Sequence, residues 1–468
     1  MSKNFKKREE GKEIVSRFEE MIRKENNYFF DLESFEYIIG HYLESGKFKK
    51  ALFACNLAME QYPYSLDLLH EKAQILANME QFEEALELIS RAEILQPHDA
   101  EILMLKGNIQ ALTGDFQGAI ETLESIVLFT DEKDEIYYNL GLAYMGMNDY
   151  DNAIAYYKKA LEENLNNENA LYELAYCLDV KGELENSLNY YQKFIDNDPY
   201  SFNAWYNIGI IYNKLGKFDE AIKAYEYATL INDKFSSAFF NMGNSFMNQS
   251  NFAEALKNYK FTLDLEEPSA ELLCSIGSCY EKLSQYDQAI GYYRKASKLD
   301  PTFDEAWYGM GICLDAKEKW LEAVHFLNKA LKLDPDNPDY WLAIADAEYK
   351  AGNIVSGLEA YEEASLLDPG NSEIWLNWSF ILYEQGDYEK AINLVHNGIE
   401  EIPESADLYY RLTAYLIVSG KYKEAFTYLE NALILDFENH TVLFDFFPKL
   451  ETQKALYKII EQYRTKNT

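Results

Sequence analysis

Cysteine is scarce in this sequence, and its spacing argues against two classes of protein. The 468 residues include five cysteines, none of them in a C-x-x-C pair. An odd, unpaired set is typical of a reducing compartment and not of a disulfide scaffold or a zinc-binding domain. The five are Cys55, Cys177, Cys274, Cys279 and Cys313.

Long hydrophobic runs are absent as well. No stretch approaches the roughly 18 apolar residues that a membrane-spanning helix requires. The N-terminal segment is rich in charged residues and lacks the apolar core of a secretory signal. These absences predict a cytoplasmic protein with no membrane-inserted segment.

Positive charge is also in short supply. Lys and Arg number 43 against 79 Asp and Glu, which gives a formal net charge of −36. The resulting field repels nucleic-acid backbones and anionic membranes. We therefore expect an acidic protein with no nucleic-acid partner, whose protein or peptide partners are neutral or basic.

Glycine and proline are few, at 22 and 10 residues, and this favours long runs of regular structure. Hydrophobic residues make up 48% and aromatic residues 15% of the chain. That supply is enough to bury sizeable cores, so the acidic composition does not indicate a disordered tail.

What the sequence does contain is a repeat of 34 residues. Steps of 34 from Ala51 meet a small residue twelve times with no insertion. Self-similarity at a fixed period of this length indicates a solenoid. The twelve positions are Ala51, Ala85, Ala119, Ala153, Ser187, Ala221, Ala255, Ala289, Ala323, Gly357, Ala391 and Ala425.

Proline and glycine follow the same period. Seven of the ten prolines share one phase: Pro63, Pro97, Pro199, Pro301, Pro335, Pro369 and Pro403. One glycine phase holds Gly46, Gly114, Gly182, Gly216, Gly352, Gly386 and Gly420. A second glycine phase holds Gly107, Gly141, Gly209, Gly243, Gly277 and Gly311.

Each repeat is predicted to form two antiparallel helices. In the sixth repeat an apolar stripe with helical spacing ends near Gly216, which can adopt the left-handed conformation that closes a helix. A second stripe begins at Ala221, and a proline at the Pro301 phase cannot continue that helix. One such pair cannot bury both of its faces, so neighbouring pairs must stack.

The motif W-x2-L-G-x2-Y, followed by A-x3-F and then by Ala and Pro, resembles the tetratricopeptide repeat. The resemblance implies an all-α fold, a right-handed α-solenoid superhelix of helix-turn-helix repeats. It places twelve repeats at 32–437, between an N-terminal charged capping helix at 1–31 and a C-terminal capping helix at 438–468. The motif occurs as Trp205-Ile208-Gly209-Tyr212, Tyr137-Leu140-Gly141-Tyr144 and Trp307-Met310-Gly311-Leu314.

No motif in the chain indicates catalysis or a cofactor. The phosphate-binding G-x4-GK[ST], the zinc-binding HExxH and the nucleophile GxSxG are all missing. The six histidines lie in distant repeats, which disfavours a shared metal site. We expect a non-enzymatic protein with no catalytic residues, no metal and no cofactor.

Two sets of residues are expected to be buried packing rather than sites. Cys177, Cys279 and Cys313 share a phase that family members commonly fill with a small buried residue. Tyrosines share the phase that the family uses for the core of its second helix. These are Tyr157, Tyr191, Tyr225, Tyr259, Tyr293 and Tyr361.

Another aromatic series is the candidate binding surface. By the resemblance, its phase points from the first helices into the concave groove, where exposed apolar patches mark binding sites. The series is Tyr138, Tyr172, Tyr206, Phe240, Tyr308 and Tyr410, and the positions four residues further on in repeats four to six hold Leu142, Tyr176 and Ile210. The alternative is that these rings only pack between adjacent first helices.

Asparagines occupy the next groove phase, at Asn139, Asn207, Asn241 and Asn377. This set resembles the asparagine ladder with which the superhelix of the O-linked N-acetylglucosamine transferases holds a peptide backbone. Acidic residues recur at a further groove phase, where the helix dipole alone would favour them. Lysine and arginine are missing from the Tyr206 and Glu305 phases. A clamp for the acidic tail of a chaperone is therefore not expected.

The leading hypothesis is a scaffold or adaptor that binds a peptide segment of a partner protein in this groove. One alternative is the recognition subunit of a multi-protein enzyme or of a biogenesis or secretion complex. Another is a structural homo-oligomer.

Overall fold

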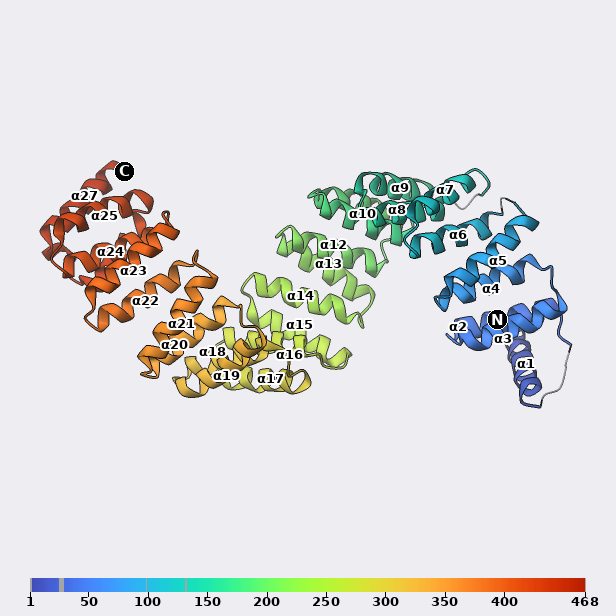
Figure 1. The fold of residues 1–468 in the computed structure, drawn as a ribbon, viewed down its shortest axis with the longest axis horizontal. Helices are drawn as coiled ribbons and strands as arrows, with labels where there is room; N and C mark the ends of the chain where they lie inside the picture. Colours follow the sequence, from blue (N-terminus) through green and yellow to red (C-terminus); the bar gives the residue numbers. More distant parts are fainter. Residues whose placement is uncertain (1, 25–28, 98, 131–132, 468) are drawn as a thin grey trace. The chain divides into compact units, whose positions relative to one another are not determined.

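The computed structural model describes residues 2–24, 29–97, 99–130 and 133–467, and every regular element in that part of the chain is a helix (Figure 1). The chain divides into two compact units, Met1–Asn232 and Asp233–Thr468. Each unit contains six helix pairs joined by short turns. This confirms the predicted all-α solenoid of helix-turn-helix repeats.

The first unit begins with α1 (Ser2–Lys24). Its first helices are α2 (Leu32–Glu44), α4 (Leu66–Asn78), α6 (Ala100–Leu112), α8 (Lys133–Gly146), α10 (Glu168–Val180) and α12 (Phe202–Lys214). Its second helices are α3 (Phe48–Gln61), α5 (Phe82–Leu95), α7 (Phe116–Ile126), α9 (Tyr150–Glu163), α11 (Ser187–Asn197) and α13 (Phe218–Ile231). A 3-10 turn, η1 (Leu184–Asn186), precedes α11.

The second unit repeats this order and ends in shorter elements. Its first helices are α14 (Ser236–Asn248), α16 (Ala270–Lys282), α18 (Asp304–Ala316), α20 (Pro338–Lys350), α22 (Ser372–Glu384) and α24 (Ala406–Val418). Its second helices are α15 (Phe252–Leu265), α17 (Tyr286–Leu299), α19 (Trp320–Leu333), α21 (Ile354–Leu367), α23 (Tyr388–Glu401) and α25 (Tyr422–Leu435). The chain continues through η2 (Glu438–Val442), α26 (Leu443–Phe446), η3 (Leu450–Thr452) and α27 (Lys454–Asn467).

The turn inside each pair is closed by one residue in the left-handed conformation. All seven glycines of the Gly216 phase have positive φ, between 66° and 87°. The other five repeats place a non-glycine residue in the same conformation, with φ between 58° and 61°. They are Glu80, Asn148, Ser250, Ser284 and Glu318. The predicted helix-closing role of this phase is confirmed.

In the seven repeats that have a proline at the Pro301 phase, the second helix ends before that proline, as predicted. The indole N–H of Trp205 donates to the carbonyl oxygen of Pro199 over 3.0 Å. Trp307 makes the same bond to Pro301 at 3.0 Å. In these repeats the tryptophan of the first helix therefore contacts the proline that precedes that helix.

Glycine at the Gly209 phase allows the two helices of a pair to approach closely. A Cβ atom on Gly209 would lie 2.4 Å from the Tyr225 ring. On Gly311 it would lie 2.5 Å from Leu327 and 3.3 Å from the Ala323 carbonyl oxygen. Side chains cannot occupy these distances, so glycine is required at these contacts.

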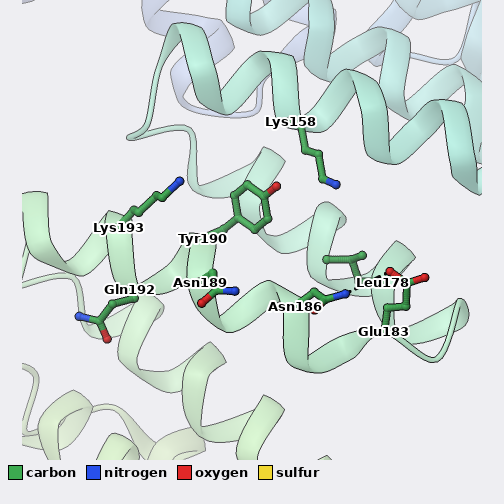
Figure 2. Close-up of a pocket in the computed structure, with 8 residues that line it drawn as sticks. All are labelled: Lys158, Leu178, Glu183, Asn186, Asn189, Tyr190, Gln192 and Lys193. Atoms are coloured by element: carbon green, nitrogen blue, oxygen red, sulfur yellow. Dashed lines mark hydrogen bonds between the residues drawn. The ribbon is translucent and has the colours of Figure 1, made fainter.

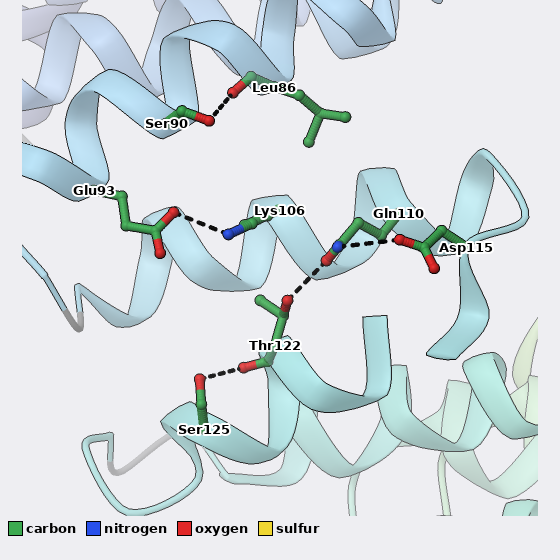
Figure 3. Close-up of polar contacts among 8 residues, drawn as sticks. All are labelled: Leu86, Ser90, Glu93, Lys106, Gln110, Asp115, Thr122 and Ser125. Atoms are coloured by element: carbon green, nitrogen blue, oxygen red, sulfur yellow. Dashed lines mark hydrogen bonds and ion pairs between the residues drawn. The ribbon is translucent and has the colours of Figure 1, made fainter. Parts of the chain in front are cut away.

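Polar side chains join neighbouring helices, as Figure 3 shows for α5, α6 and α7. Lys106 of α6 forms an ion pair with Glu93 of α5 at 2.9 Å. Gln110, also on α6, accepts from the Thr122 hydroxyl at 2.8 Å. Asp115 caps the first turn of α7 by accepting from the Gly118 N–H at 3.0 Å. These contacts fix the register of adjacent helices at the surface.

Both terminal segments pack on the nearest repeat. Phe18 of α1 is fully buried, with its ring 5.7 Å from Phe30 and 6.4 Å from Phe35. At the other end, Leu456 and Ile460 of α27 are buried in a cluster with α23, α24 and α25. Residues 1, 25–28 and 468 of the two predicted capping segments lie outside the described residues.

Candidate functional site

The residues expected to be packing are buried. All six tyrosines of the second-helix phase are at most 3% exposed. Cys177, Cys279 and Cys313 are fully buried, with free thiols. Burial raises the pKa of the Cys279 thiol to about 12, so this thiol is not a reactive thiolate at neutral pH. The prediction that these residues serve the core is confirmed.

The residues of the candidate binding surface behave differently. Twelve of the thirteen positions named for this surface are not buried, and Tyr172 and Tyr176 are 53% and 47% exposed. One member of the aromatic series departs from it. Tyr410 is 1% exposed, and its hydroxyl donates to the Asp436 carbonyl oxygen at 2.6 Å. The groove prediction was wrong for Tyr410, because the chain after α25 folds back over α24 and covers this ring.

Within the first unit, four of the predicted residues line one hollow of about 220 Å³. Tyr172 and Tyr176 come from α10, and Asn207 and Ile210 come from α12. The rest of the lining is Ala175, Asp179, Leu184, Tyr191, Ile211 and Lys214. The predicted groove residues therefore converge most closely between repeats five and six.

Repeat five, which forms part of the hollow, differs from most other repeats at two positions. Ten of the twelve repeats begin their second helix with an aromatic residue, but this repeat has Leu184. Eight of the twelve have alanine at the phase where this repeat has Phe194, which is 2% exposed. Leu184 of η1 lines the hollow.

Helix α11 contributes Tyr191 to the lining of the hollow. The Tyr191 side chain is 1% exposed, and its buried hydroxyl has no hydrogen-bond partner. Burial raises the pKa of Tyr191, and the neighbouring Asn207 amide opposes this rise. The two groups are thus close, without the geometry of a hydrogen bond.

One ion pair lies at the hollow, between Asp179 of α10 and Lys214 of α12. Sequence reasoning did not single out Asp179, Lys214 or Leu184, and it assigned Tyr191 to the core. The signal in the sequence was that repeat five differs from the common repeat pattern, because such differences indicate where the packing changes.

A second, more polar hollow of about 540 Å³ lies on the same repeat. Figure 2 shows the Lys158 and Lys193 side chains on either side of the Tyr190 ring. Their amines lie 5.8 Å and 5.7 Å from the ring centroid. Both lysines therefore already have a cation–π partner within the chain.

Four predicted residues of the first unit do not line the apolar hollow. Tyr138 packs on the core ring of Tyr157 at 6.0 Å, and Tyr206 packs on that of Tyr225 at 5.8 Å. The other two, Asn139 and Leu142, are partly exposed on α8. The structure thus shows both behaviours considered for this series, packing for some rings and exposure for others.

In the second unit, Asn377 is partly exposed on α22, and the other predicted residues make contacts within the unit. Phe240 packs on Tyr259 at 5.4 Å, and the Asn241 amide oxygen accepts from Asn244 at 3.5 Å. Tyr308 lies 4.8 Å from Tyr340 and also lines a hollow of about 430 Å³. That hollow includes Glu271, Glu281 and Glu305 in its lining.

Carboxylates of the first helices differ in how they are solvated. The recurring acidic phase, which includes Glu33 and Glu305, lies in first turns, where the helix dipole stabilises it. Glu71 of α4 lies at the Asn207 phase, and one of its oxygens is buried without a partner. Burial, with the charges of Glu36 and Asp67, raises the pKa of Glu71 to about 7.

No group of three or more His, Cys, Asp or Glu side chains among the described residues could hold a metal ion. In the same part of the chain, no helix has both the length and the apolar composition to cross a bilayer.

Comparison with known families matches three sequence models, all described as tetratricopeptide repeat. They cover residues 42–109, 138–202, 202–235, 240–302, 281–347 and 348–416. Tetratricopeptide repeat proteins are generally protein-interaction scaffolds rather than catalysts. No curated protein sequence matches the chain.

Several solved structures are similar to this one. The crystal structure of the APC/C hetero-tetramer Cut9–Hcn1 is 14% identical, with 82% of this chain and 89% of that chain covered and a TM-score of 0.43. The crystal structure of YrrB, a TPR protein with an unusual peptide-binding site, is 20% identical, covering 39% and 95% with a TM-score of 0.34. For MamA the identity is 20%, the coverage 37% and 94%, and the TM-score 0.34.

Proposed function

Since the chain belongs to the tetratricopeptide repeat family, we propose that it is a non-enzymatic scaffold that binds a peptide segment of a partner protein along its first helices. The observation that carries this proposal is the hollow between α10 and α12, with its two half-exposed tyrosines. Exposed aromatic side chains around a concave surface are the usual anchors of protein interfaces.

The contacts available there suit a peptide. Tyr172, Tyr176 and Ile210 offer apolar contact, and the Asn207 amide can both donate and accept hydrogen bonds. Elsewhere on the first helices the recurring carboxylates, together with the net charge of −36, favour a neutral or basic segment. We place the primary binding surface at repeats five and six. Tyr138, Asn139, Leu142 and Tyr206 extend it within the first unit.

Two further parts of the proposal concern the ends and the location. We assign 1–31 and 438–468 to capping segments around the repeats at 32–437, because both ends bury apolar residues on their neighbouring repeat. The cysteine usage, with five free thiols of which four are buried, favours the cytoplasm.

A quantitative pull-down from native cytosol tests the proposal. Tyr172→Ala combined with Tyr176→Ala should reduce recovery of the bound partner at least tenfold, because both anchors are lost. The rings are about half exposed, so the fold should be retained with unchanged helical circular dichroism.

The matched control is Tyr200→Ala, which removes a 78% exposed tyrosine outside the hollow. It should retain the partner. Equal recovery by all three proteins would place the interaction on another surface. Turnover of a substrate by the isolated chain would refute the non-enzymatic assignment.

A further inference from the structure

The Tyr191 hydroxyl lacks a contact that its counterparts Tyr259 and Tyr293 have; the Tyr225 hydroxyl lacks it too, but Tyr225 does not line the hollow. Tyr259 donates to Asn244 at 2.6 Å, and Tyr293 donates to Glu281 at 2.7 Å. In each case the acceptor is on the first helix of the same repeat, fifteen or twelve residues earlier. For Tyr191 these two positions hold Tyr176 and Asp179.

Neither position supplies an acceptor to Tyr191. The Asp179 carboxylate instead pairs with Lys214 of the next first helix. Tyr176 is 47% exposed. The hydroxyl is therefore left buried without a partner, a condition that usually costs about 1–3 kcal/mol and is rare in folded proteins.

The hollow beside this hydroxyl has the size of one side chain. At about 220 Å³ it lies below the range of roughly 300–1,000 Å³ that is usual for whole small-molecule ligands. Tyr172 and Tyr176 offer aromatic surfaces, and Ile210 and Leu184 complete an apolar wall. Its polar groups include the Tyr191 hydroxyl and the Asn207 amide.

We propose that this hollow receives the side chain of a tyrosine from the bound peptide. The Tyr191 hydroxyl donates to the phenol oxygen of that tyrosine, and the phenol O–H donates to the Asn207 amide oxygen. The incoming ring lies against Tyr172 and Tyr176. This inference rests on the proposed function, since it names the anchor residue of the same groove.

The charges around the hollow select the unmodified form of tyrosine. Glu168 and Glu173 lie close enough to Tyr191 to raise its pKa further. Lys214, a cation of the lining, is already paired with Asp179. A phosphate group would meet these carboxylates without a free counter-charge, so phosphorylation of the incoming tyrosine should abolish its binding.

The test uses two small probes and the full chain. p-Cresol is the side chain of tyrosine, and toluene is the side chain of phenylalanine. Ligand-observed NMR titrations should show saturable binding of both probes, with p-cresol about tenfold tighter because only it pairs with Tyr191. In Tyr191→Phe the preference for p-cresol should vanish.

Two further variants separate this effect from loss of fold. Tyr157→Phe removes the equivalent hydroxyl of repeat four, outside the hollow, and should keep the tenfold preference. Leu184→Phe introduces the aromatic residue that most repeats have at this position. It should fill the hollow and abolish binding of both probes. Tyr191→Phe should melt no lower than the parent, since the hydroxyl it removes has no partner.

Equal affinities of the two probes for the parent protein would overturn the inference. A preference that survives in Tyr191→Phe would do the same, and so would binding that survives in Leu184→Phe. If the Tyr172 and Tyr176 double variant still loses its partner in the pull-down, the groove function stands and only the tyrosine anchor fails.

Discussion

One residue in the turn of each repeat adopts the left-handed conformation, and the residue type at this position differs between repeats. Seven repeats use glycine there, and five impose the same conformation on a residue with a side chain. For non-glycine residues this conformation costs roughly 1–2 kcal/mol. The five turns therefore hold strain that a single substitution can remove.

We expect Glu318→Gly and Glu80→Gly to stabilise the protein by about 1 kcal/mol each, because both residues have φ near 60°. Chemical denaturation of the parent and the two variants would measure the change. Gly352→Ala is the reverse control, with φ at 87°, and it should destabilise. Lower stability of both glycine variants would show that local side-chain contacts outweigh the strain.

The protonation of Glu71 makes the stability of the protein depend on pH. Its pKa is raised to about 7, so the folded protein holds a proton at pH 5–7 that the unfolded chain has already released. The contribution of this proton to the free energy of unfolding is fully present below about pH 4.5, the pKa of a glutamate in the unfolded chain. It falls by at most about 3 kcal/mol as the pH rises to 7. Above pH 7 that contribution is lost.

Glu71→Gln should therefore be more stable than the parent at pH 8 and nearly equal to it at pH 4.5. Urea unfolding at both pH values measures this difference. Glu101→Gln removes an exposed carboxylate from the next first helix and should show no such dependence. A pH-independent effect of Glu71→Gln would mean that the buried oxygen is solvated.

At the scale of the helix pair, packing depends on small residues at fixed places. The Gly209 phase lets a tyrosine or leucine of the second helix lie directly on the first helix. At four junctions a tryptophan indole also donates a hydrogen bond to the proline carbonyl oxygen that precedes its helix. Twelve pairs can follow one plan because these contacts depend on a few residue types.

Gly311→Leu should disrupt this packing, because even a Cβ atom there would meet Leu327 at 2.5 Å. Overpacking of a core typically costs about 1–3 kcal/mol. Gly291→Leu is the matched control, since a Cβ atom on that helical glycine has no neighbour within 4 Å. Thermal melting should fall for the first variant and not for the second. Equal melting of Gly311→Leu and the parent would contradict the placement.

Much of this architecture could be predicted from the sequence, because each residue of the repeat pattern makes its contacts within its own helix pair or with the next helix pair. The hollow could not, since its lining combines Leu184 of η1 with side chains from α10, α11 and α12. The burial of Tyr410 was also missed, because the segment that covers it lies beyond the regular repeats. The 34-residue period describes the average environment of each repeat position, whereas the hollow lies where that environment differs from the average.

At the scale of the whole molecule, the chain consists of two units with separate cores. The first unit, Met1–Asn232, has a cluster around Tyr157 and Tyr191, and the second, Asp233–Thr468, has a cluster around Tyr259 and Tyr293. In a solenoid each repeat depends mainly on its neighbours, so stability is close to a sum of local terms. Six stacked repeats with a terminal segment therefore contain the contacts between neighbouring repeats that stabilise one unit.

We expect residues 1–232 and 233–468 to fold as separate polypeptides. Their circular dichroism spectra should add up to that of the intact chain, and each should melt cooperatively. The fragment 1–232 contains the whole hollow of repeats five and six, so it should bind p-cresol as tightly as the full chain. Loss of helicity in either fragment would show that its stability depends on the other. Retained helicity with loss of p-cresol binding would show that the hollow needs residues beyond 232.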